Sequence, residues 1–282
     1  MSNPTITALN SFSVLRFTGE KTQGFLQGQL TCDMQLLSEQ GNYSFTACCD
    51  HRGRMFANFW VVNWQNDFLF ILPKSVCETL KNHLQKYAAF SKVTITIEND
   101  FFIAEQHQTA TDPLSLTVSS VRAPAINNES HAICISLPNK NRHLIIAEKN
   151  PFSHATINHD ETSWRQNNIV DQLAILCDKT SLLFTPQMIN LEKIGGVSFT
   201  KGCYVGQEIV ARTQHLGTLK RHLHRLTINT NETLNPGDAV KNPNGDNIGV
   251  VIDAILLGDN KADILAVIED RKVILASSNF QN

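Results

Sequence analysis

The sequence predicts an α+β protein, and three observations support that prediction. Of its 282 residues 42% are hydrophobic and 18% are charged, which is the balance of a chain that folds around a core. Short runs of alternating apolar and polar residues recur along the chain, as in half-buried strands. One longer segment, residues 75–90, has apolar residues at helical spacing instead.

The N-terminal part is predicted to form strands that are joined by short turns. After the first strand, Gly19 turns the chain and a short helix is expected within residues 20–30. Gly53 supplies the permissive residue of the turn "HRG", and Gln65-Asn66 joins two strands tightly. The strands predicted here cover residues 11–18, 43–50, 55–64, 67–73 and 93–98.

The helix over residues 75–90 has the clearest start signal. Ser75 is expected to cap its N-terminus, with Glu78 at the capping-box position. Its apolar face is expected to contain Val76, Leu80, Leu84 and Tyr87.

The remainder is rich in short β-like runs. Strand signals at residues 101–106, 131–137 and 143–148 are separated by polar loops, and residues 151–162 are expected to be a connection. Beyond residue 225 several short runs alternate with Asn, Gly and Asp turns, which predicts a small sandwich or barrel. Two domains are therefore expected, residues 1–225 and residues 226–282.

Composition excludes several classes of protein. The net charge of −2 gives no global attraction to nucleic acid or anionic membrane, and no run approaches the length of a membrane helix. The seven cysteines are scattered and include no C-x-x-C, which fits a reducing cytoplasm better than a disulfide framework. No phosphate-loop or zinc pattern occurs, so no bound metal is expected; His222 and His224 are interpreted as surface histidines.

The stretch "SFTKGCYVGQEIVART", residues 198–213, holds the most unusual residues. Gly202 and Gly206 free the backbone on both sides of Cys203, and a helix is expected from Gly206 onward. A helix N-terminus and the nearby Lys201 both favour a thiolate, which predicts a lowered pKa for Cys203. The alternative is that Cys203 is a buried small apolar residue, the commonest fate of a free cysteine.

The segment from Lys201 to Arg225 is locally basic. It holds five cations and one anion, Glu208, in a chain that is otherwise slightly acidic. Such a face suits a polyanion, for example a phosphate backbone or a polyglutamate tail. The alternative is a solvated strand end.

The motif "FTKGCYVGQEIVAR" resembles the signature of the YgfZ family. "FLQGQLTCD" at 25–33, "YAAFSKVTI" at 87–95 and "TPQMINLEKIGG" at 185–196 are similar to further segments of that family. The resemblance implies a fold like the glycine cleavage T-protein, with interleaved α+β subdomains around a central cavity and a C-terminal β-barrel. The chain is expected to be a cytoplasmic monomer.

The resemblance also implies a cofactor. Family members are thought to bind tetrahydrofolate near two aromatic positions, which match Phe12 and Trp164 here. Where relatives carry a glutamate that bonds the pterin, this chain has Val170, with Asp171 one residue further on. Asp171 is the expected substitute.

For function, the resemblance implies support of iron–sulfur cluster assembly or repair, and through it tRNA methylthiolation, with the tRNA methylthiotransferase as one partner. Cys203 is then the functional thiol and Lys201 its neighbour, whereas Cys49 is expected to be a strand-core thiol. Two alternatives remain: a folate-dependent one-carbon transferase, and a tRNA-binding module that uses the basic segment. The other motif residues are Gly202, Tyr204, Gly206, Gln207 and Glu208.

Overall fold

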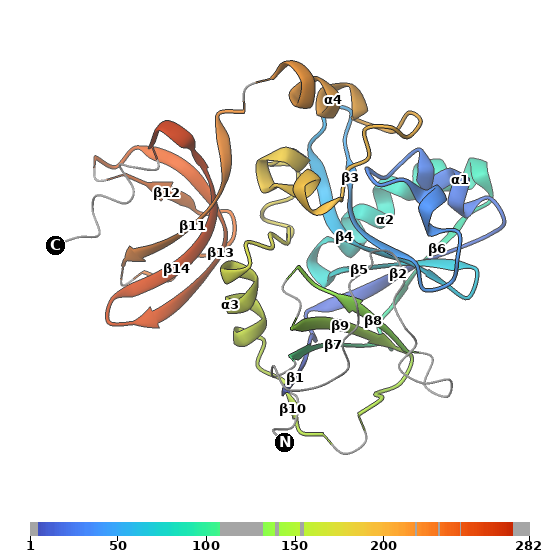
Figure 1. The fold of residues 1–282 in the computed structure, drawn as a ribbon, viewed down its shortest axis with the longest axis horizontal. Coiled ribbons are helices and arrows are strands. Elements are labelled where there is room, and N and C mark those ends of the chain that lie inside the picture. The colour runs from blue at the N-terminus through green and yellow to red at the C-terminus, as the bar shows by residue number, and fades with distance from the viewer. Residues whose placement is uncertain are drawn as a thin grey trace.

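A computed structural model describes residues 5–107, 132–138, 141–152, 155–217, 219–230, 232–242 and 244–272. These residues form three β-sheets (Figure 1): two five-stranded sheets in the N-terminal part and a four-stranded C-terminal sheet. The helix α3 (Thr162–Val170) lies between the N-terminal sheets and the C-terminal sheet, and α4 (Gln207–Leu216) lies at the top of the view. The α+β prediction is confirmed.

The first sheet has the strand order β3-β4-β5-β2-β6 and is antiparallel throughout. Gln65 and Asn66 both have positive φ, 48° and 72°, as a tight two-residue hairpin requires. All five strands were predicted from the sequence. Their bounds are β2 Phe12–Thr18, β3 Tyr43–Cys49, β4 Met55–Trp64, β5 Asp67–Pro73 and β6 Thr94–Glu98.

Two helices pack on one face of this sheet: α1 (Thr22–Gln27) and α2 (Lys74–Ala88). The helix α2 begins one residue earlier than predicted, so Ser75 lies in its first turn and caps nothing. Tyr87 is 46% exposed, because Ala88, four residues after the buried Leu84, continues the apolar face instead. The prediction was therefore right for the helix but wrong for its cap and for Tyr87.

The second sheet has the order β10-β1-β7-β9-β8 and packs against the other face of the first. Its strands β7 (Phe102–His107), β8 (Ala132–Ser136) and β9 (Arg142–Ala147) were predicted. Two strands were missed, β1 (Thr5–Ala8) and the two-residue β10 (Ile157–Asn158), which pair in parallel with each other. Both are too short to show a clear period.

Helix α3 (Thr162–Val170) was also missed, because its sequence is largely polar. It buries Trp164 and Ile169 and packs against strand β13 (Asn247–Gly258) of the C-terminal sheet. An irregular segment with two 3₁₀ helices, Pro186–Ile189 and Leu191–Ile194, leads to α4 (Gln207–Leu216). No helix in the described ranges is long and apolar enough to cross a bilayer.

The C-terminal sheet has the order β11-β14-β13-β12, with bounds Arg221–Asn229, Lys261–Glu269, Asn247–Gly258 and Ala239–Lys241. Among residues 221–272 that the structure describes, β11 and β12 are opposite edges and no strand pairing joins them. The predicted barrel is therefore not confirmed; β12 pairs only with β13, over three residues. Strand β11 runs across the expected domain boundary at 225–226.

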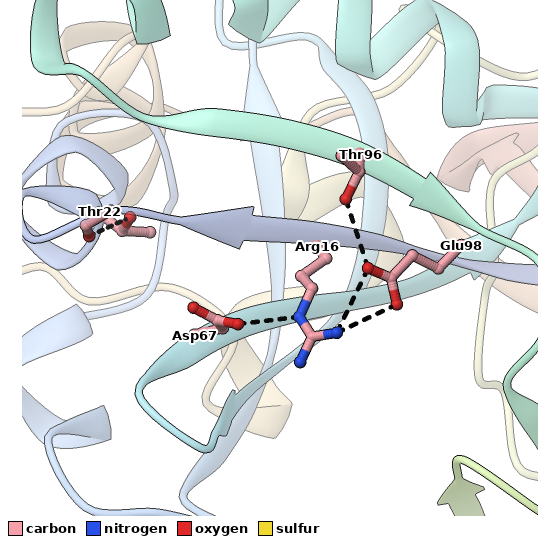
Figure 2. A network of polar contacts seen from close by, with 6 residues as sticks. Arg16, Thr22, Asp67, Thr96 and Glu98 are labelled. Atoms are coloured by element: carbon pink, nitrogen blue, oxygen red, sulfur yellow. Dashed lines mark hydrogen bonds and ion pairs between the residues drawn. The ribbon is translucent and has the colours of Figure 1, made fainter.

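An arginine joins three strands of the first sheet (Figure 2). Arg16 on β2 donates through Nε to Asp67 on β5 at 2.9 Å and through Nη1 to Glu98 on β6 at 3.3 Å. Thr96 donates to the same Glu98 carboxylate. These side chains are partly exposed, so the network adds little to stability and mainly fixes side-chain positions at this edge.

Candidate functional site

The cysteine motif lies along the end of α1 and the loop that follows it. The backbone N–H of Val205 donates to the Gly28 carbonyl at 3.1 Å. The Ser198 N–H donates to the Thr31 carbonyl at 2.8 Å, and the Thr31 hydroxyl donates to the Gly196 carbonyl at 2.6 Å. Two of the segments that carry the family resemblance, 25–33 and 198–213, are therefore in direct contact.

Lys201 is buried at the centre of this contact. Its ammonium donates to the carbonyls of Gln27 at 2.6 Å, Leu30 at 2.9 Å and Cys32 at 2.6 Å. The three N–H donors of the ammonium thus satisfy carbonyls at and beyond the C-terminal end of α1, where a helix leaves such groups unpaired. Burial lowers the pKa of Lys201 to about 8, against the attraction of Cys32 and Asp33.

This arrangement gives Lys201 a role that the sequence did not suggest. The expectation placed its charge beside the Cys203 thiol, whereas the structure directs its ammonium to three backbone carbonyls and over the Tyr204 ring at 5.1 Å. Lys201 fixes the loop that carries Cys203. An effect of its charge on the thiol stays a prediction.

Cys203 itself is exposed, so it is not the buried apolar residue of the alternative interpretation. Cys177 is half-buried, and the other five cysteines are buried: Cys32, Cys48, Cys49, Cys77 and Cys134. Burial raises the pKa of Cys49 well above its usual range, in agreement with the strand-core expectation for that residue. An exposed thiol on an anchored loop can react with a partner molecule; a thiol in the core cannot.

The two glycines of the motif play different parts. Gly206 has φ +85° and caps α4, and a Cβ built on it would lie 2.5 Å from the Asp50 carbonyl oxygen. Gly202 has no atom within 4 Å of such a Cβ and no left-handed backbone. The requirement for glycine therefore holds at Gly206, where the motif packs on the turn between β3 and β4.

The remaining motif residues support the turn. Tyr204 is buried, and burial raises the pKa of its hydroxyl. The Gln207 N–H donates to the Tyr204 carbonyl at 3.1 Å as α4 begins. Glu208 is exposed in the first turn of α4, where a negative charge is favourable. The helix predicted from Gly206 onward is present.

The two predicted aromatic positions are neighbours in space. Phe12 on β2 and Trp164 on α3 meet edge to face, with ring centroids 5.8 Å apart. Trp60 lies beside Trp164 at 6.4 Å. Phe12 and Trp164 are 6% and 2% exposed, so protein covers both rings.

A buried polar network around Arg142 of β9 lies against this aromatic cluster. Its guanidinium carbon lies 5.2 Å from the centroid of the Trp164 ring, and its nitrogens donate to Glu105, Asp171 and Asn168. Arg142 and Glu105 are 0% and 2% exposed. Asp171 is therefore ion-paired, whereas Val170, the aligned position, is 45% exposed.

Four of these residues are of the types that can hold a reduced folate. Trp164 and Phe12 have aromatic rings of the kind that stack on a pterin, and Asp171 and Glu105 are carboxylates, which accept from N–H donors. Both carboxylates already accept hydrogen bonds from Arg142. Because Trp164 is covered, stacking on it requires a neighbouring side chain to move.

Arg142 and Glu105 are the site residues that sequence reasoning missed. Glu105 lies on β7 and Arg142 on the neighbouring strand β9. Their charged residue types are unusual only once these two strands are known to be buried. A charged residue at each of two buried strands was the available signal.

The basic segment is partly neutralised by the C-terminal sheet. Arg225 pairs with Asp263 at 2.8 Å, and His222 and His224 both lie near the Asp270 carboxylate, at 2.8 and 3.5 Å. The two histidines are thus partly exposed on one strand face and share an acidic partner. Desolvation acts to raise the pKa of Asp270, but its hydrogen bonds with these histidines and their charge together lower it.

Comparison with solved structures defines the fold. The chain is similar to the glycine cleavage system aminomethyltransferase T from Bartonella henselae, with a TM-score of 0.64 over 95% of this chain and 79% of that one. The sequence identity is 12%, so this likeness shows the fold alone. The predicted T-protein-like fold is confirmed.

Comparison with curated proteins defines the family; no family model matches the sequence. The chain is 31% identical to the tRNA-modifying protein YgfZ of Colwellia psychrerythraea, over 92% of this chain and 87% of the relative. It is 32% identical to that of Sodalis glossinidius, over 94% and 85%. The chain belongs to the YgfZ family.

Proposed function

We propose that this chain is a folate-binding accessory protein in tRNA modification, with Cys203 as its functional thiol. Its relatives are named tRNA-modifying proteins. The observation that carries the proposal is the exposed Cys203 on a loop fixed from both sides, by Lys201 against α1 and by Gly206 against the β3–β4 turn. In this role the protein would support iron–sulfur cluster assembly or repair, on which tRNA methylthiolation depends.

Cys203→Ala in a strain that lacks the native gene tests the thiol. Loss of methylthiolated nucleosides, with an unchanged unfolding transition of the purified variant, supports the proposal. The matched control is Cys177→Ala, which removes the other partly accessible thiol and is expected to leave methylthiolation intact. Full complementation by Cys203→Ala would show that the thiol is not required.

The folate part of the proposal concerns Phe12, Trp164 and the Arg142 network. A reduced folate, when bound, carries one-carbon units; the protein residues supply aromatic surface and carboxylate acceptors. A carboxylate that bonds a ligand donor contributes about 1.5–3 kcal/mol. Asp171→Asn is therefore expected to weaken tetrahydrofolate binding by about one to two decades.

Titration with tetrahydrofolate, followed by tryptophan fluorescence, tests this part. Trp164→Phe is the matched control, because Trp60 and Trp64 stay in place and any remaining quenching reports on them. Quenching that needs Trp164 supports the proposal. Neither quenching nor heat of binding at high micromolar ligand would overturn the folate claim.

The T-protein-like fold favours one second candidate, a folate-dependent one-carbon transferase. Formation of methylenetetrahydrofolate from tetrahydrofolate and an aminomethyl donor by the purified protein would support it. The sequence offers no clear acidic residue for the transfer, so the accessory role stands first.

A further inference from the structure

A cavity separate from the thiol loop and the aromatic cluster lies where the β3–β4 turn faces the C-terminal sheet. Its volume is about 650 Å³, in the range of small-molecule sites. Three arginines line it, together with one acid and an apolar wall. The lining residues are Asp50, Arg52, Arg54, Leu182, Leu183, Phe184, Met188, Arg221, Val250 and Val267.

The three arginines of this cavity differ from most others in the protein. Within the described ranges, Arg16, Arg142, Arg165 and Arg225 each form an ion pair with a carboxylate. Over the same ranges, none of Arg52, Arg54 and Arg221 forms one. Three arginines and one aspartate line the cavity, so its net charge is positive and favours a bound anion.

The one acidic residue in the lining is already engaged. Oδ1 of Asp50 accepts hydrogen bonds from the backbone N–H groups of Arg52 and Arg54, at 2.9 and 2.8 Å. Asp50 thereby holds the turn that carries these two arginines. Arg54 also donates through Nη1 to the Leu183 carbonyl, which fixes its guanidinium beside the apolar wall.

The apolar wall sets the second requirement on the ligand. Phe184 is buried in it, and Leu182 and Leu183 are 39% and 41% exposed, unusually open for leucines. Val250 and Val267 come from two neighbouring strands of the C-terminal sheet. A small inorganic anion would leave this surface exposed to water, whereas an anion with a planar or apolar body would cover it.

We propose that this cavity binds a nucleoside phosphate, with the phosphate held by Arg52, Arg54 and Arg221 and the base against Leu182, Leu183 and Phe184. Arginine forks match phosphate oxygens in pairs, and a base presents a flat apolar face. The same chemistry occurs in a free mononucleotide and in a nucleotide of an RNA chain. The proposal rests neither on folate nor on Cys203.

The cavity is close to the thiol loop through a single turn. Gly206 packs on Asp50 and Gly53, the residues between which Arg52 lies. A ligand on Arg52 and Arg54 therefore binds to the same turn that supports the cysteine motif. The nucleotide and the thiol would be held at fixed relative positions by this turn.

Binding is tested on the full chain by calorimetry, with AMP, inorganic phosphate, a short single-stranded oligoribonucleotide and tri-γ-glutamate as separate probes. The proposal is supported if AMP or the oligonucleotide binds more tightly than both phosphate and triglutamate. If AMP binds more tightly than the oligonucleotide, the natural ligand is a free nucleotide; if the oligonucleotide binds more tightly, the natural ligand is RNA. Triglutamate as the tightest probe, or no binding by any of them at millimolar concentration, overturns it.

Arg52→Gln and Arg221→Gln are the informative variants, because both residues are exposed and their substitution is expected to leave the fold intact. Each is expected to weaken nucleotide binding about tenfold or more. Arg212→Gln is the matched control: it removes the same charge from an exposed residue outside the cavity. Equal weakening by all three variants would indicate non-specific attraction and overturn the assignment of the site.

Discussion

At the scale of single residues, Lys201 has a structural role that its place in the motif does not reveal. A lysine two places before a cysteine suggests a charge that acts on the thiol. In the folded protein the same lysine is 8% exposed and holds three carbonyls. No sequence pattern reports that, because the carbonyls belong to a segment about 170 residues away.

Removal of the Lys201 ammonium is expected to destabilise the fold. Lys201→Met leaves three carbonyls without their donor, and leaving buried polar groups unsatisfied costs about 1–3 kcal/mol. Urea unfolding measures the change. Lys193→Met, the same substitution at an exposed lysine, is the control and should stay within about 0.5 kcal/mol of the parent. Equal stability of the two variants would contradict the anchoring role.

The pKa of Lys201 predicts a pH dependence with a definite sign. Because the folded pKa of about 8 lies below the ordinary value of 10.5, the unfolded chain binds more protons between these values. The free energy of unfolding contributed by this group therefore rises with pH from about pH 8 to about pH 10. The quantity to measure is the difference between the parent and Lys201→Met at each pH. A difference that falls over this window would refute the assignment.

At the scale of elements, the turn before α4 explains which glycine the motif needs. Gly206→Ala is expected to cost about 2 kcal/mol or more, since its left-handed φ and the nearby Asp50 carbonyl both oppose a Cβ. Gly202→Ala is the matched control and should change stability by less than about 0.5 kcal/mol. Thermal unfolding of both variants decides; similar losses would mean that the turn is not built as described.

Helices α2 and α3 show what local sequence can and cannot predict. Apolar residues at helical spacing made α2 evident. The helix α3 buries Trp164, Asn168 and Ile169, but its stability comes from packing on β13 and from Arg142, which a local window does not contain. The same holds for β1 and β10: β1 pairs with β7 and with β10, and β10 pairs with β1.

The candidate site, too, was only partly predictable from the sequence. The cysteine motif could be found from its own residues and the family resemblance, because its residues are contiguous. Phe12 and Trp164 were matched only through the family, and Arg142 with Glu105 was not found at all. A network assembled from two strands and a helix has no signature within any one of them.

At the scale of the whole molecule, Arg165 joins the N-terminal part to the C-terminal sheet. It lies on α3, pairs with Asp253 of β13 and donates to the Ala254 carbonyl at 2.9 Å. Arg165→Met should cost about 1 kcal/mol, less at high salt because the pair is partly exposed. Hydrogen exchange of residues 247–258 should quicken.

Arg16→Met is the control for this prediction. It breaks a comparable, partly exposed ion pair inside the first sheet and should leave exchange in the C-terminal sheet unchanged. If both variants quicken exchange there equally, Arg165 has no particular role in joining the two parts.

The distribution of the cysteines has a practical consequence. Of seven thiols, five are buried and Cys177 is half-buried, so a maleimide fluorophore or spin label added to the native protein should attach first at Cys203. The probe would then sit on a loop that Lys201 keeps rigid, which suits distance measurements to a docked partner. The wild-type chain thus carries its own attachment point for spectroscopic probes, at the thiol that is proposed to be functional.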